Sequence, residues 1–78
     1  MKTRVRIKTK LLKRLGENIQ KIRISKNITQ EQLAEKIGSD RSYIGAIEQG
    51  RKSPSMYCLY NIAFALETTL SELVNFEL

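Results

Sequence analysis

The chain has 78 residues, a net charge of +6, no histidine and a single cysteine. This length leaves room for one small domain, which is marginally stable unless its helices pack economically or a second chain adds buried surface. With no histidine, one cysteine and one aspartate, the chain cannot form a familiar nucleophilic triad or a transition-metal site, and it has no glycine-rich phosphate loop. We therefore expect no catalysis, no metal and no cofactor.

Charge is distributed unevenly along the chain. Lysine and arginine outnumber acidic residues ten to one in residues 1–26, the two balance at four each in residues 27–52, and residues 53–78 carry three acidic and no basic residues. A basic segment suits a polyanion, because each neutralised phosphate releases condensed counterions. A solvated charged surface without a partner is the alternative. With no export signal or membrane-spanning segment, and with Cys58 in an apolar run, we expect a cytoplasmic protein.

Basic residues alternate with Thr, Val and Ile over residues 2–10. A period of two predicts an extended segment if this stretch is ordered. The chain offers no second strand pattern, so a strand here could pair only with another molecule. We expect a basic N-terminal arm over residues 1–10, which is disordered in the free protein, contacts DNA phosphates or the minor groove, or exchanges between two copies.

A first helix is predicted from Leu11 to about Lys26. Its apolar residues recur at intervals of three and four, namely Leu12, Leu15, Ile19 and Ile22. Gly16 weakens this helix by roughly 1 kcal/mol relative to alanine. Asn27 stands where the helix must turn, and asparagine tolerates the left-handed conformation that such an end needs.

Residues 29–54 are typical of two short helices joined by a tight turn. Thr29 begins the first with a capping box to Gln32, and Ala34 and Gly38 are small enough to let the second helix brace against it. Asp40 is a good N-cap for the second helix. Ile44 and Ile47 form its buried side, so the expected outward residues are polar or small: Arg41, Ser42, Gly45, Ala46 and Gln49. This arrangement predicts a helix-turn-helix that reads DNA.

Gly50 is expected to end that helix, and Ser55 to cap a fourth. Besides a core stripe of Leu59, Ile62, Ala63 and Leu66, the fourth helix carries Tyr57, Tyr60 and Phe64 on another side. A helix that is apolar nearly all round must be buried nearly all round. A partner subunit could cover these aromatic residues, or they could fold over the first helix of the same chain.

Thr69 begins the last helix with a second capping box, to Glu72, and Leu70, Leu73 and Val74 form its inner face before Phe76. The predicted fold is all-α: a compact five-helix bundle containing a helix-turn-helix, preceded by the basic extended arm. Residues 11–78 form the DNA-binding domain, and its C-terminal helices are expected to mediate dimerisation through Tyr57, Tyr60, Phe64 and Phe76.

A family resemblance rests on three blocks of the chain: TQEQLAEKIG, DRSYIGAIEQGRKSPS and IAFALETTLSELV. From Leu15 to Val74 the chain resembles the XRE family of helix-turn-helix repressors, of the phage-repressor and Cro type. The run DRSYI followed by IE is also similar to the controller proteins of restriction-modification systems. Two positions depart from the family pattern: Ser39 replaces a usually apolar residue, and Gly45 lies inside the recognition helix.

The resemblance implies a role for individual residues. It assigns base contacts to Arg41, Ser42 and Ala46, phosphate contacts to Gln30, Tyr43, Gln49, Arg51, Lys52 and Ser53, and a structural ion pair to Arg23 and Glu48. A guanidinium can donate to both acceptors of a guanine, which favours Arg41 as a base-reading residue. Alternatively, Arg41 pairs with Asp40 or another acid on the surface, Ser42 only supports the helix start, and Gln49 and Lys52 are ordinary surface residues.

Two functions from different classes remain open. The first is a transcriptional regulator, such as a repressor, that binds a palindromic operator as a homodimer at the nucleoid; it is a candidate controller of restriction-modification genes, with RNA polymerase as a further candidate partner. The second is an antitoxin-like or other protein-interaction module that uses the aromatic C-terminal surface. The oligomeric state would discriminate them.

Overall fold

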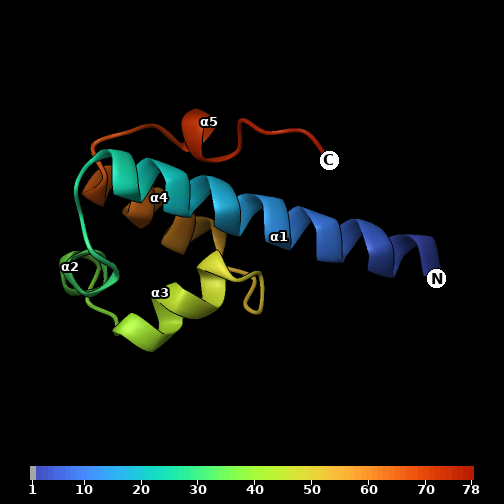
Figure 1. Ribbon diagram of the computed structural model, residues 1–78, viewed down its shortest axis with the longest axis horizontal. Coiled ribbons are helices and arrows are strands. Elements are labelled where there is room, and N and C mark those ends of the chain that lie inside the picture. Colours follow the sequence, from blue (N-terminus) through green and yellow to red (C-terminus); the bar gives the residue numbers. More distant parts are fainter. Residues whose placement is uncertain (1) are drawn as a thin grey trace.

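The computed structural model describes residues 2–78, and Met1 of the predicted arm lies outside the described residues. The helices are α1 (Lys2–Ser25), α2 (Gln30–Lys36), α3 (Arg41–Glu48), α4 (Met56–Ala65) and α5 (Leu70–Leu73). Figure 1 shows α1 running the length of the molecule, with α2 and α3 on one side of it, α5 on the other and α4 behind. The predicted all-α fold with five helices is confirmed. None of the helices in residues 2–78 is long and apolar enough to cross a membrane.

The predicted extended arm is wrong, because residues 2–10 form the beginning of α1. A strand needs a partner for its backbone groups, whereas a helix satisfies its own and simply continues the one formed by residues 11–25. Lysine, arginine and leucine are also good helix formers. The hydroxyl of Thr9 donates to the carbonyl oxygen of Val5, 2.9 Å away, as helical spacing allows. The period-two pattern therefore arises from charge placement and not from a strand.

The four predicted N-caps are confirmed. Each side-chain oxygen accepts from the backbone N–H three residues on: Thr29 from Gln32, Asp40 from Tyr43, Ser55 from Cys58 and Thr69 from Glu72. The structure records the reciprocal bond of a capping box at Thr29, whose N–H donates to Oε1 of Gln32 at 2.9 Å. It records none for the second capping box, predicted at Thr69.

Helices α1 to α4 all end with one residue in the left-handed conformation: Asn27 (φ 59°), Gly38 (φ 69°), Gly50 (φ 76°) and Glu67 (φ 54°). In each case the next residue donates back to a carbonyl in the last turn, as from Ser39 to Ala34 at 2.8 Å. The predictions for Asn27 and Gly50 are confirmed. Gly38 was expected to allow close helix packing, but no atom lies within 4 Å of where its Cβ would be, so its backbone conformation is what requires glycine.

All five helices contribute to one core. Its buried members are Leu15, Ile19, Leu33, Ala34, Ile44, Ile47, Leu59, Ile62, Ala63, Leu66 and Leu73. Asn18 ties α5 to α1, because its amide donates to the carbonyl oxygens of Glu72 and Leu73 at 2.8 and 2.7 Å. Val74 was expected on the inner face of the last helix, but it is exposed because the helix ends at Leu73.

Gly16 is the point at which α1 meets the end of α3. A Cβ at this position would overlap the backbone carbonyl oxygens of Ile47 and Glu48. The sequence indicates only the helix-weakening effect of this glycine, whereas the structure shows that the close approach of two backbones depends on it.

Gly16→Ala should lower the free energy of unfolding by about 1–3 kcal/mol, because the colliding atoms are backbone and cannot rotate away. Gly45→Ala is the matched control: the nearest atom to its Cβ would be Gln30 Oε1 at 3.9 Å, so this change should stabilise the protein by up to about 1 kcal/mol through helix propensity. Urea denaturation measures both. Equal stability of the Gly16→Ala variant and the wild type would contradict the close approach.

Candidate nucleic-acid interface

A buried ion pair joins the first and third helices. Arg23 Nε lies 2.6 Å from Glu48 Oε2, and the two side chains are only 9% and 1% exposed. A second guanidinium nitrogen lies 3.2 Å from the other carboxylate oxygen, which makes the contact bidentate. The remaining Nη1 donates to the carbonyl oxygen of Ile28 at 2.7 Å. The pair that the family resemblance implies is thus in contact here.

Gln30 extends this contact to the second helix. Its Nε2 donates to Oε1 of Glu48 at 2.9 Å, an interaction that the sequence did not indicate. Glu48 therefore accepts from α1 and α2 at once, and no buried side-chain nitrogen or oxygen in the described residues lacks a partner. Because hydrogen bonds are directional, the three residues fix the orientation of α3 relative to the helices that support it.

The first turn of α3 presents Arg41 and Ser42 to solvent. The carboxylate of Asp40 accepts from the backbone N–H of Tyr43 at 2.9 Å, and the structure records no ion pair between Asp40 and Arg41. The guanidinium of Arg41 is therefore not held by the neighbouring acid, which was the alternative to a base contact.

Ala46 does not face outward as predicted. It is 5% exposed, and the N–H groups of Arg51 and Lys52 both donate to its carbonyl oxygen, at 2.8 and 3.3 Å, so the turn after α3 lies close to its backbone. Gly45, which lies one turn after Arg41, is partly exposed. The outward face of α3 consequently consists of Arg41, Ser42, Gly45 and the C-cap Gln49.

The expected phosphate-contacting residues lie around this face. Arg51 Nε donates to Oε1 of Gln49 at 2.9 Å, and both side chains are exposed, as are Lys52 and Ser53. Tyr43 is half-buried, and its hydroxyl donates to Sγ of Cys58 at 3.7 Å. This hydrogen bond, together with burial, raises the pKa of Tyr43 above its ordinary value, so the phenol remains protonated at neutral pH.

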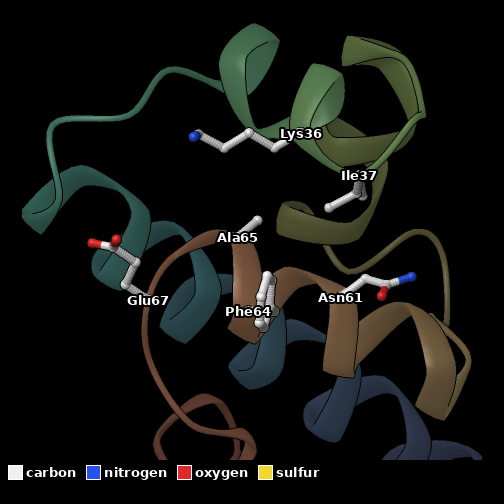
Figure 2. Close-up of a pocket in the computed structure, with 6 residues that line it drawn as sticks. All are labelled: Lys36, Ile37, Asn61, Phe64, Ala65 and Glu67. Atoms are coloured by element: carbon white, nitrogen blue, oxygen red, sulfur yellow. The ribbon is translucent and has the colours of Figure 1, made fainter.

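A strip of three aromatic side chains, Tyr57, Tyr60 and Phe64, lies on the exposed side of α4. They are 78%, 64% and 80% exposed, so the alternative that they fold over the first helix of the same chain is wrong. Figure 2 shows Phe64 beside a pocket between α2 and α4, with Ile37 and Lys36 across from it. Phe76 is not part of this strip: it is half-buried and packs against the core of its own chain.

Comparison with known proteins gives consistent matches. The helix-turn-helix family model (HTH_3) matches residues 19–73. An uncharacterised HTH-type transcriptional regulator of Sinorhizobium fredii, y4dJ, is 36% identical over 62 residues, which are 80% of each chain. The control protein C.SmaI of Serratia marcescens is 38% identical over 60 residues, 77% of this chain and 71% of that protein. The crystal structure of the restriction-modification controller protein C.AhdI from Aeromonas hydrophila superposes with a TM-score of 0.78 at 35% identity, covering 80% of this chain and 90% of that one.

Glu48→Ala should destabilise the protein by about 3–5 kcal/mol, because it leaves the guanidinium of Arg23 buried without a counter-charge. Replacing the exposed Glu35 by alanine is the control and should change stability by less than about 0.5 kcal/mol. Thermal and urea unfolding followed by circular dichroism measure both. Similar small effects from the two substitutions would show that the ion pair does not restrain α3.

Proposed function

We propose that this chain, which belongs to the helix-turn-helix family (HTH_3) of DNA-binding transcriptional regulators, binds a two-fold symmetric operator as a homodimer, with α3 of each copy in a major groove. One observation carries the proposal most directly: a polar, sterically open face of α3 is held rigidly by the buried contacts of Glu48 with Arg23 and Gln30. A helix held at a fixed tilt can place its side chains against base edges.

In this proposal Arg41 and Ser42 read bases. A guanidinium at the start of the helix can donate to both O6 and N7 of a guanine. Gly45 takes the place expected for Ala46: without a side chain, it lets the backbone of α3 approach the base pairs closely.

The contacts to the DNA backbone come from residues around α3. Four of them lie at its end and in the turn that follows: Gln49, Arg51, Lys52 and Ser53. Gln30 of α2 lies beside the last turn of α3, and Tyr43 lies in the first turn with its hydroxyl on Cys58 of α4. Gln30 has one amide hydrogen left after its bond to Glu48, and that hydrogen can be donated to a phosphate. Such contacts position the protein without reading sequence.

The aromatic strip, Tyr57, Tyr60 and Phe64, forms the dimer contact in this proposal. Large apolar side chains exposed together mark a surface for another protein, and a second copy provides the same surface in return. Two recognition helices about 34–36 Å apart would then enter successive major grooves on one side of the duplex.

Control proteins among the relatives favour a role in restriction-modification gene control, in which the protein acts at the nucleoid as a repressor or, through RNA polymerase, as an activator. The exposure of the aromatic strip also favours a second candidate, an antitoxin-like module that binds a different protein there. A protein that remains monomeric at micromolar concentration with the strip exposed would favour this second function.

Arg41→Ala should relax the preference at one base pair by about 1–3 kcal/mol, whereas Lys52→Ala should weaken all duplexes equally and reduce the salt dependence of binding. Selection of bound fragments from random duplex DNA, followed by titration, measures both effects. A palindromic consensus is expected for the wild type. An unchanged base preference in the Arg41→Ala protein would refute the base contact.

Phe64→Ser should shift the protein from dimer to monomer without unfolding it, because the ring is 80% exposed within one chain. Ile24→Ser is the control, since this side chain is 57% exposed and lies on α1 instead of α4. Sedimentation velocity at micromolar concentration gives the oligomeric state. Unaltered sedimentation of the Phe64→Ser protein would place the dimer contact elsewhere.

A further inference from the structure

The first half of α1 extends beyond the domain. Residues 4–11 are all exposed, and Figure 1 shows the N-terminal end of α1 projecting past the other helices. The turn at Gly50 marks where the projection starts, since a Cβ there would lie 3.0 Å from the Cα of Lys13. At about 1.5 Å per residue, the part before this contact is roughly 15 Å long. No contact with the core explains why residues 4–11 are helical.

The net positive charge of the protein is concentrated in the residues that precede the family match, which include this projecting segment. Residues 1–18 contain seven lysines and arginines and one acidic residue, a net charge of +6. Residues 19–73, which match the family model, contain seven basic and six acidic residues, a net charge of +1. The family domain by itself is therefore almost neutral, and the attraction to a polyanion comes mainly from outside it.

The charges on this segment repel one another. Arg4 and Lys8 are four residues apart, as are Arg6 and Lys10, and like charges at this spacing destabilise a helix. Glu17 is the one acidic residue in residues 2–18, and its carboxylate lies 3.9 Å from Arg14. A row of phosphates would relieve this repulsion, whereas solvent only screens it.

One stripe of the segment continues the proposed phosphate-contacting surface. Arg6, Lys10 and Lys13 are spaced by four and three residues, so they share a face of α1. Lys13 lies against the Gly50 turn, which is followed by Arg51 and Lys52. Positive charge therefore runs from the end of α3 onto the projecting helix.

We propose that the stripe Arg6, Lys10 and Lys13 binds phosphates of the duplex that flanks the site read by α3. This inference rests on the proposed function and extends the contacted DNA beyond the operator core. A membrane surface fits less well, because the exposed apolar residues of residues 4–12 are Val5, Ile7 and Leu11, and only Ile7 and Leu11 share a side of the helix, which gives a small apolar face.

The test compares two double variants of the full chain. Arg6→Gln with Lys10→Gln removes two charges from the stripe, and Arg4→Gln with Lys8→Gln removes the same residue types from the other side of the same segment. Glutamine has a helix propensity close to that of lysine and arginine, so circular dichroism should show equal helicity. Affinity is measured against salt on the selected operator, with and without about ten flanking base pairs at each end.

We expect the wild type to bind the flanked operator more tightly than the short one. The R6Q/K10Q protein should lose this difference, and its slope of log K against log salt on the flanked duplex should fall by about 0.9 for each phosphate that the variant no longer neutralises. The R4Q/K8Q protein should retain most of the difference. Equal weakening by both variants, or the same weakening on both duplexes, would overturn the inference.

Failure of the proposed function gives a different result. If the wild type selects no operator, that function fails, and the same pair of variants is then compared on long and short duplexes of random sequence. If the two variants bind these duplexes with equal affinity, the inference that the stripe binds phosphates is overturned. If Arg41→Ala changes base preference while R6Q/K10Q binds like the wild type, only the further inference fails.

Discussion

A single buried carboxylate restrains the orientation of α3. Glu48 accepts from Arg23 of α1 and from Gln30 of α2, so one residue on α3 is fixed by both supporting helices. Bringing this charge out of water is costly, and an apolar contact of the same volume could hold the helices as firmly. Apolar packing, however, restricts the crossing angle only within a broad range, and directional hydrogen bonds to a fixed carboxylate restrict it further. A helix that enters a groove of fixed geometry needs a defined angle.

This constraint lets the molecule separate its two surfaces. Most lysine and arginine residues lie on α1, and the others include Arg41 on α3 and Lys52 in the turn after it. The exposed aromatic residues lie on α4, and the chain has no basic residue after Lys52. Tyr43 lies between the two, with its ring half-buried and its hydroxyl on Cys58 of α4. A substitution on the aromatic strip can therefore leave the outward face of α3 unchanged.

The sequence determines local features well and contacts between helices less well. The N-caps and the left-handed ends at Asn27 and Gly50 are predictable, because each depends on a few neighbouring residues. The close approach at Gly16 and the bond from Gln30 to Glu48 are not, since each joins residues far apart in the chain. Ala46 was misplaced because helical periodicity does not contain the path of the chain after α3, which returns close enough for Arg51 and Lys52 to donate to the carbonyl oxygen of Ala46.

The core that all five helices share is complete within one chain. Separation of the proposed dimer would therefore leave two folded halves and not two denatured chains, so association would be reversible. Occupancy of a two-fold site would then rise with the square of the monomer concentration. At low concentration such a regulator would leave its site mostly empty, and occupancy would rise steeply once the protein has accumulated. The time at which its target genes are regulated would then depend on how fast the protein accumulates.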